Sequence, residues 1–310
     1  MTCLYSTYTY ILLSATNVFK MLELLQSLKI SLLHTGYAKL GPEWNFDNVI
    51  SPFTRLFYVT KGSASVYHNN KTYTLKQGYM YLIPSYVYNT YRCEHYHEQF
   101  YISFFEEIRT GLSIYNLRSF NYEVPVKDGD HLLFERLTKM YPKRKIVNND
   151  PTAYLHRPQE LLQYNRDNAK MNTQRYLETH GILTILLSRF IENEPAQNAN
   201  ITPGRLDDVL IYIAEHLNQV LEVQDLAKKY HMSTDYFSRL FLHQFNMRPL
   251  KYIQTKRIER AQLLLWTTNH SLEEIAHKIG MENFSYFSRT FKKLTGTTPG
   301  KYRKNQTISP

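Results

Sequence analysis

Two arginines stand in matching sequences near the C-terminal end of the chain. Arg239 and Arg289 each follow Tyr-Phe-Ser, and a phenylalanine comes two residues after each of them. The planar guanidinium group can donate two hydrogen bonds at once to the major-groove edge of guanine, so an exposed arginine on a helix can read a base. A single exposed arginine is usually a solvated charge. Because the placement is duplicated, the two residues favour DNA as the partner.

The sequence around these arginines repeats with a period of about 50 residues. The matching positions are Leu226-Ala227 with Ile275-Ala276, Met232 with Met281, Phe241 with Phe291, Pro249 with Pro299 and Tyr252 with Tyr302. Each copy is typical of a short helix, a tight turn and a second helix. Ser271 and Glu274 fit a capping box in the second copy, and Ser233 and Asn283 are suitable N-caps for the two second helices. The sequence therefore predicts two helix-turn-helix units.

The second helix of each unit has an apolar face, which we expect to be core, and a polar face. The residues expected to point outward are Thr234, Asp235, Ser238, Arg239 and His243 in the first copy, and Ser285, Ser288, Arg289, Lys292 and Lys293 in the second. A connecting helix over 249–267 would be roughly 28 Å long, close to the repeat of about 34 Å at which B-DNA presents the same face. Lys256, Arg257 and Arg260 on this helix are expected to contact phosphate or an acidic neighbour.

Residues 205–304 resemble the DNA-binding domain of the AraC/XylS family of bacterial transcription regulators. The motifs that carry the resemblance are Asp225-Leu-Ala227, Tyr236-Phe-Ser-Arg-Leu-Phe241, Arg257-Ile-Glu-Arg-Ala-Gln-Leu-Leu-Leu265, Glu274-Ile-Ala276, Ile279-Gly280-Met281, Tyr286-Phe-Ser-Arg-Thr-Phe291 and Gly296-Thr-Thr-Pro299. Members of this family insert two recognition helices into adjacent major-groove segments. By position, the resemblance implies that bases are faced by Asp235, Ser238, Arg239, Ser285, Ser288 and Arg289.

Phosphate contacts are expected from four further outward residues, Thr234, His243, Lys292 and Lys293. One position departs from the repeat, because Leu242 stands where the second copy has Lys292. We therefore expect fewer phosphate contacts from the first unit than from the second.

Charge and cysteine content agree with a polyanion partner in a reducing compartment. The formal net charge is +10, and residues 205–310 hold 16 Lys and Arg against 10 Asp and Glu. Such an excess favours a polyanion over an acidic small substrate. The two cysteines, Cys3 and Cys93, provide no disulfide framework, so a cytoplasmic location is expected. The first twenty residues lack both the basic segment of a signal peptide and the length of a membrane-spanning helix.

The N-terminal half predicts a different kind of domain. Between 53 and 105, short runs rich in Tyr, Val, Phe and Thr are separated by turn residues such as Lys61-Gly62, Asn69-Asn70 and Gln77-Gly78, which predicts strands. The expected fold class is α+β: an N-terminal cupin-like antiparallel β-barrel with a helical segment, then an all-α domain with two helix-turn-helix units. The expected boundaries are an extension over 1–40, a barrel over 41–125, a helical and dimerising segment over 126–192, a linker over 193–204 and the DNA-binding domain over 205–304.

Tyrosines are crowded in the expected barrel. Many members of the family bind a small effector in such a barrel, and aromatic faces with hydroxyl tips suit a sugar or a similar polar ring. The residues expected to line this effector pocket are Tyr58, Tyr67, Tyr81 and Tyr88. The alternative is that these tyrosines are ordinary strand residues that pack against the sheet with their hydroxyl groups in water.

Two rival functions stay open from the sequence. His95 and His97 alternate along an expected strand with Glu98 nearby, and this trio would suit a metal-dependent cupin enzyme fused to a helix-turn-helix module. The C-terminal fold could also serve protein contacts, since a fold does not dictate function. The basic outward faces favour DNA instead.

The sequence therefore predicts a DNA-binding regulator and not an enzyme. We expect a sequence-specific, effector-responsive transcription activator, with double-stranded DNA, a small-molecule effector such as a sugar, and RNA polymerase as partners. A homodimer is expected, and no membrane, cofactor or metal.

Overall fold

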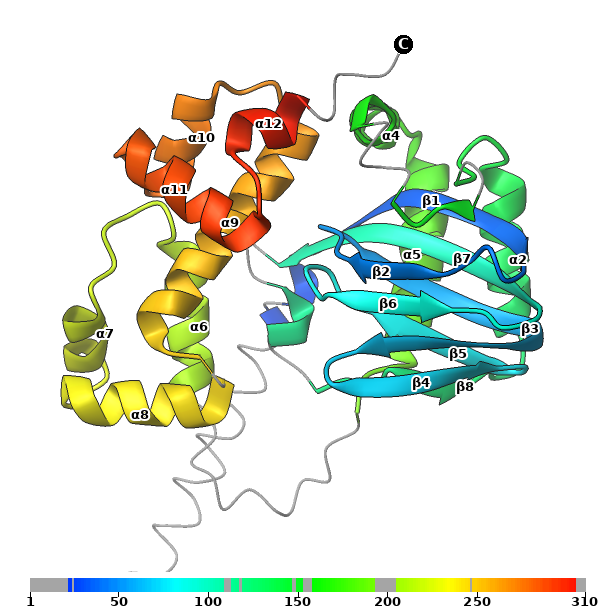
Figure 1. Cartoon of the computed structure of the whole chain (residues 1–310), viewed down its shortest axis with the longest axis horizontal. Helices are drawn as coiled ribbons and strands as arrows, with labels where there is room; N and C mark the ends of the chain where they lie inside the picture. Colours follow the sequence, from blue (N-terminus) through cyan, green and yellow to red (C-terminus); the bar gives the residue numbers. More distant parts are fainter. Residues whose placement is uncertain are drawn as a thin grey trace, which may run out of the picture.

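The computed structural model describes residues 22–23, 25–108, 113–116, 119–146, 149–152, 158–192, 205–245 and 247–304. These residues form an antiparallel β-sheet domain with helices beside it, followed by a helical domain (Figure 1). The predicted α+β organisation is confirmed at this level. The predicted linker over 193–204 and residues 1–21 of the predicted extension lie outside the described residues.

Antiparallel pairing joins the strands of the first domain. One path runs through β1 (Leu28–Leu40), β7 (His97–Ile108), β3 (Thr54–His68), β5 (Tyr79–Ile83) and β8 (Glu123–Pro125). The second half of β3 also pairs with β4 (Lys71–Lys76) and β6 (Asn89–Arg92), and β6 pairs with β2 (Phe46–Val49). Strand β3 therefore belongs to two groups of strands, and its residues contribute to separate hydrophobic clusters, with Leu56 in one and Val66 in another.

Strand β1 lies inside the range for which the sequence predicts an extension, 1–40. It pairs with β7 along its whole length, so the sheet begins at Leu28 and not after residue 40. The register shifts between Leu32 and His34, and both Leu32 and Leu33 are buried. This bulge breaks the alternation of apolar and polar residues by which a strand is recognised in a sequence.

The pair Lys61-Gly62 lies within β3 and does not form the predicted turn. The register of β3 with β7 shifts between Val59 and Lys61, and Gly62 has a φ of 68°. A Cβ atom at Gly62 would lie 2.2 Å from the backbone oxygen of Tyr96, so only glycine fits this bulge. The predicted turn at Asn69-Asn70 is confirmed, with φ of 49° and 60° at its two residues.

Among the described residues, the helices α2 (Asp130–Met140), α4 (Pro158–Ala169) and α5 (Thr173–Ser188) accompany the sheet. A single-turn 3-10 helix, η1 (Ile114–Asn116), precedes β8. Helix α5 buries Ile182, Leu183, Leu186 and Leu187 in the cluster that also holds sheet residues such as Leu56. The opposite side of α5 exposes Leu177 and Ile185. One face of α5 thus covers the sheet, and apolar residues remain exposed on another.

The helical domain consists of α6 (Arg205–Glu215), α7 (Val223–Lys229), α8 (Thr234–Phe245), α9 (Pro249–Thr267), α10 (Leu272–Lys278), α11 (Phe284–Thr295) and α12 (Pro299–Lys304). The predicted capping box of Ser271 and Glu274 is confirmed at the start of α10, and the Asn283 side chain caps α11. Within the described residues, no helix has the length and apolar character needed to cross a membrane.

Helix α9 lies between the two helix pairs, α7–α8 and α10–α11 (Figure 1). Its first half contributes Tyr252 and Ile253 to the cluster of the first pair, and its second half contributes Ile258 and Leu265 to the cluster of the second pair. Arg257 of α9 donates from Nε to the backbone oxygen of Leu217 at 3.0 Å, beyond the end of α6. Helix α9 therefore holds the two pairs together.

The second pair approaches the segment between α6 and α7 closely at Gly280, in the turn between α10 and α11. Gly280 has a φ of 70°, and a Cβ atom there would lie 2.6 Å from the backbone oxygen of Leu217. Gly296 also has a positive φ, 79°, but a Cβ atom there would meet nothing within 4 Å. The two glycines thus share a backbone conformation and differ in their surroundings.

We expect Gly296→Ala to lower the free energy of unfolding by about 1 kcal/mol, because alanine is strained at positive φ. Gly280→Ala should lower it by about 3 kcal/mol, because the new methyl group also meets the backbone near Leu217. Urea unfolding followed by far-ultraviolet circular dichroism measures both losses. Equal losses would show that the close approach at Gly280 is not rigid.

Candidate nucleic-acid interface

Helix α8 separates a buried apolar face from an exposed polar face. Phe237 and Phe241 are fully buried, whereas the predicted contact residues Thr234, Asp235, Arg239 and His243 are exposed and Ser238 is half-buried. Arg239 pairs with Asp235 at 3.0 Å, one helical turn earlier, with 74% and 81% of the two side chains exposed. Such an exposed pair contributes little to stability, so both side chains remain available to a ligand.

Helix α11 presents the same arrangement one repeat later. Phe287 and Phe291 are buried, Ser285, Arg289, Lys292 and Lys293 are exposed, and Ser288 is half-buried. Arg289 donates from Nε to the backbone oxygen of Ser285 at 3.3 Å. The structure therefore places every predicted DNA-facing residue of the two copies on the accessible side of a helix.

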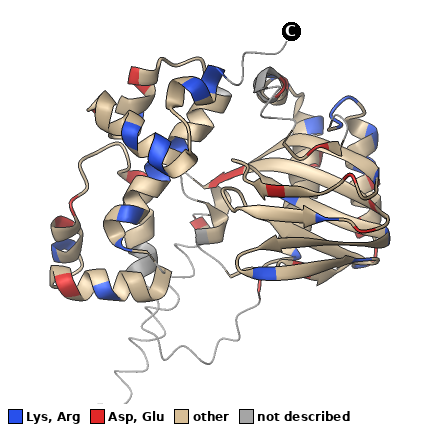
Figure 2. Ribbon diagram, in the orientation of Figure 1, with Lys and Arg blue, Asp and Glu red and all other residues tan. Residues whose placement is uncertain are grey.

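The two exposed faces differ in charge. Helix α8 carries both signs and α11 carries basic residues (Figure 2). On α8, Asp235 offsets the charge of Arg239, and Leu242 is exposed where α11 has Lys292. The α11 face therefore has the stronger attraction for an anionic partner.

Side-chain hydrogen bonds join α9 to α11 and to the segment between α6 and α7. Gln254 of α9 donates to the hydroxyl group of Tyr286, in the first turn of α11, at 2.5 Å. Arg257 donates to the backbone oxygens of Leu217 and Gln219, between α6 and α7. Lys256 and Arg260 pair with Glu259 and Glu107. Of the two partners predicted for Lys256 and Arg260, the structure shows the acidic neighbour.

The four tyrosines predicted to line an effector pocket lie in different surroundings. Tyr81 is fully buried, and its hydroxyl group donates to the backbone oxygen of Thr74 at 2.6 Å. Tyr58 is half-buried and stacks on Phe100. Tyr67 and Tyr88 are exposed. None of the four side chains lines the cavity between β5 and α9, the cavity beside Trp44 or the cavity beside His180. An effector pocket at these residues stays a prediction.

The trio considered as metal ligands is also dispersed. His97 is buried against Trp44, with ring centroids 4.9 Å apart, and His95 is exposed. The carboxylate of Glu98 accepts hydrogen bonds from Tyr37 and Tyr96. Burial lowers the pKa of His97. Among the described residues, no three His, Cys, Asp or Glu side chains are grouped to hold a metal ion.

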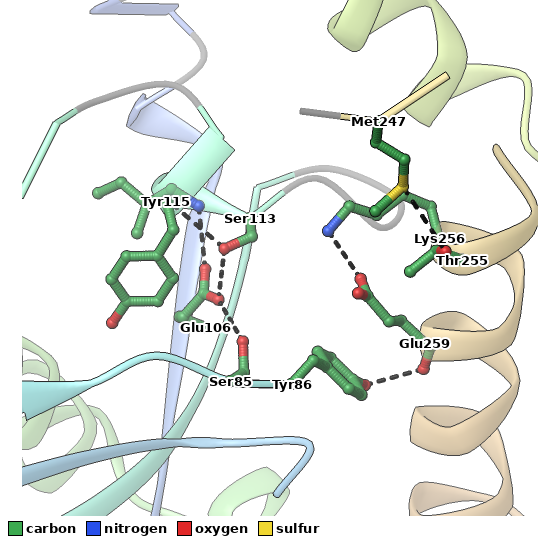
Figure 3. Close-up of polar contacts among 10 residues, drawn as sticks. Ser85, Tyr86, Glu106, Ser113, Tyr115, Met247, Thr255, Lys256 and Glu259 are labelled. Atoms are coloured by element: carbon green, nitrogen blue, oxygen red, sulfur yellow. Dashed lines mark hydrogen bonds and ion pairs between the residues drawn. The ribbon is translucent and has the colours of Figure 1, made fainter. Parts of the chain in front are cut away.

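Sequence reasoning missed the contact between the sheet domain and α9, which we call the seam. Tyr86 donates from its hydroxyl group to the backbone oxygen of Glu259 at 2.8 Å (Figure 3). Arg260 of α9 pairs with Glu107 of β7. Trp266 is buried in a cluster with Leu33, Phe53 and Phe105 of the sheet domain. No local sequence signal joins these residues, because the contacts span more than 150 positions of the chain.

Tyr86 adopts a backbone conformation that is unusual for a large side chain, with a φ of 59°. Its backbone N–H donates to the oxygen of Ser51 at 2.7 Å, and its hydroxyl group reaches α9. These two contacts hold the strained residue in place. The seam is therefore a specific contact between the two domains.

Comparison with known proteins gives a family match over the C-terminal domain and individual relatives that match part or most of the chain. A family model described as a helix-turn-helix domain matches residues 226–305. The uncharacterized HTH-type transcriptional regulator YisR of Bacillus subtilis (strain 168) is 25% identical over 277 residues, covering 87% of this chain and 91% of that protein. The arabinose operon regulatory protein of Escherichia coli (strain K12) is 30% identical over 140 residues, covering 44% of this chain and 48% of that protein.

Among solved structures, the DNA-binding domain of AdpA, a global transcriptional factor, in complex with a target DNA is 31% identical, with a TM-score of 0.32. This match covers 32% of the chain and 90% of that domain. The chain spans less than half of the length of several curated relatives that it matches, 41%, 46% and 48% in three cases.

The helix-turn-helix match covers α8 to α12 and most of α7, where the two exposed faces lie. The relatives that match here and along most of the chain are transcriptional regulators, as the sequence resemblance predicts. Over residues 226–305 this chain is therefore similar to DNA-binding transcription regulators of the AraC type.

Proposed function

We propose that the chain binds DNA sequence-specifically by placing α8 and α11 in adjacent segments of the major groove. The observation that carries this proposal is the match between the two exposed faces, on which serine and arginine occupy the same places with buried phenylalanines behind them. Helix α9 supports it, because its contacts hold both pairs in one arrangement.

Each residue type suits its proposed contact. Arg239 and Arg289 would donate to guanine, Asp235 would accept from cytosine, and Ser238, Ser285 and Ser288 would bond to either groove-edge donors or acceptors. Phosphates would be contacted by Thr234, His243, Lys292 and Lys293. Because α11 is the more basic helix, the second pair would supply most of the salt-dependent affinity.

We further propose that the chain is an effector-responsive activator. The support for a response is the seam, since Tyr86 and Glu107 of the sheet domain contact α9, the helix that spaces the two recognition helices. A ligand that binds one state of the seam more tightly would shift the population of DNA-binding arrangements. An activator would also contact RNA polymerase while it is bound to DNA. Transcription in vitro with purified RNA polymerase, with and without the chain, would test for this activation.

A homodimer is proposed through the exposed apolar side of the helices beside the sheet. Leu177 of α5 is 62% exposed and Leu132 of α2 is 56% exposed, with Tyr176 and Ile185 also exposed. Apolar side chains exposed together in this way favour a protein partner, and a second copy of the chain would place two DNA-binding domains on paired sites.

The first prediction concerns base reading. Selection of bound duplexes from random DNA by the full chain should enrich a motif with two half-sites about one helical turn apart. Arg289→Ala should then cost about 1 to 3 kcal/mol at one base pair of that motif and relax specificity there. Titration against each base substitution measures this effect.

Lys293→Ala is the matched control, because it should weaken all sequences equally and flatten the dependence of affinity on salt. If Arg289→Ala behaves like this control, Arg289 contacts phosphate. If the folded chain enriches no motif, the proposal of sequence-specific binding fails.

The second prediction concerns assembly. Leu177→Lys should convert a micromolar dimer to monomer in sedimentation equilibrium, because a charge would be buried in the apolar interface. Leu250→Lys is the control, since Leu250 is 54% exposed on α9, away from α5. A wild-type chain that sediments as a monomer at these concentrations would remove the dimer.

A further inference from the structure

A cavity of about 270 Å³ lies within the seam. The sheet domain contributes Tyr86, Glu106 and Tyr115 to its walls, and α9 contributes Lys256, Glu259 and Leu263. Glu106 lies on the sheet-domain side, and Lys256 and Glu259 face it from α9 (Figure 3). This volume is just below the range of about 300 to 1,000 Å³ typical of drug-sized ligands. A small molecule would fit and would touch both domains.

The charged groups that line this seam cavity are paired, with one exception. Lys256 pairs with Glu259 at 2.7 Å, and Arg260 pairs with Glu107. In each pair the cation and the carboxylate offset one another. The remaining carboxylate is that of Glu106, which has no cation within ion-pair distance among the described residues. When Glu106 is ionised, the described walls of the cavity therefore carry one more negative charge than positive charges.

Neutral groups hold the Glu106 carboxylate in position. Ser113 donates from its hydroxyl group at 2.8 Å, Ser85 donates at 3.3 Å, and the backbone N–H of Ile114 donates at 3.1 Å. Burial raises the pKa of Glu106 to about 7, although these three donors and the charge of Lys256 act in the opposite direction. Burial makes the ionised form of the Glu106 carboxylate unfavourable in free energy unless it binds a proton or another cation.

We propose that the seam cavity binds a small organic cation, with the Glu106 carboxylate as its counter-ion. A primary ammonium group is the matching chemistry, because it can donate to Oε2 of Glu106, which accepts one hydrogen bond, from Ile114, whereas Oε1 accepts two. The rings of Tyr86 and Tyr115 suit an apolar or aromatic body attached to that group. An anion is disfavoured, since both lining cations already have carboxylate partners.

This site rests on the proposed effector response and names the chemistry of its ligand. A bound cation would contact the sheet domain through Glu106 and α9 through the opposite wall, so its affinity would differ between a closed and an open seam. Binding itself needs no DNA. Failure of the cation site and failure of DNA recognition are therefore separate results.

The test is isothermal titration calorimetry of the full chain with 2-phenylethylammonium, without DNA. The neutral 2-phenylethanol and the anionic 3-phenylpropionate have similar shapes and serve as comparison ligands. We expect the ammonium ion to bind and the other two to bind weakly or not at all. Since the cation competes with the proton on Glu106, affinity should fall about tenfold for each pH unit below 7 and level off above pH 8.

Glu106→Gln should abolish the preference for the ammonium ion, because it keeps the shape of the side chain and removes its charge. Glu94→Gln is the matched control, at an exposed glutamate outside the cavity, and should bind like the wild type. The Glu106→Gln variant should fold, since its neutral amide avoids the cost of burying an ionised carboxylate. If it does not fold, the pH dependence of ammonium binding by the wild type tests the proposal instead.

The proposal would be overturned by no binding of the ammonium ion by the wild type, by equal binding of the alcohol or the acid, or by unchanged affinity in Glu106→Gln. Loss of affinity with rising pH would also overturn it, because a carboxylate counter-ion requires the opposite sign.

Discussion

Helix α9 takes part in three hydrophobic clusters at once, and the arrangement of the whole molecule depends on this sharing. Tyr252 and Ile253 pack with the first helix pair, Ile258 and Leu265 pack with the second pair, and Trp266 packs with the sheet domain. An α-helix is stiff along its length, so a shift at one cluster is passed to the others. The positions of the two exposed faces consequently depend on how closely α9 packs against the sheet domain at the seam.

Local patterns were sufficient to predict the helical domain. Its repeat places Arg239 and Arg289 at equivalent sites, and the caps at Ser271 and Asn283 are encoded within four residues of the helix starts that they stabilise. Each of these signals acts over one or two helical turns, which is the distance over which helix periodicity and capping are specified. The same reasoning finds the exposed residues of α8 and α11, since burial of their phenylalanines determines which side faces water.

Local patterns failed where long-range packing decides the outcome. Strand β1 was missed because its bulge buries the consecutive residues Leu32 and Leu33, and Gly62 serves a bulge where the sequence suggests a turn. The tyrosines of the sheet domain look alike in the sequence, yet Tyr81 is buried and Tyr88 is exposed. Glu106 and Lys256 line one cavity although 150 positions separate them, and only the docking of α9 on the sheet domain brings them together.

The continuity of α9 also limits how the chain can change in evolution. Inserting one residue in the middle of this helix would turn its second half by about 100° relative to the first and move it by about 1.5 Å along the axis. Ile258 and Leu265 would then leave the second cluster, and Trp266 would leave the sheet domain. Loops elsewhere can lengthen without such effects. Under the proposed mode of DNA binding, the distance between the two DNA segments would therefore be inherited as a property of helix length, and descendants of this protein could change the bases that they prefer more easily than the spacing between them.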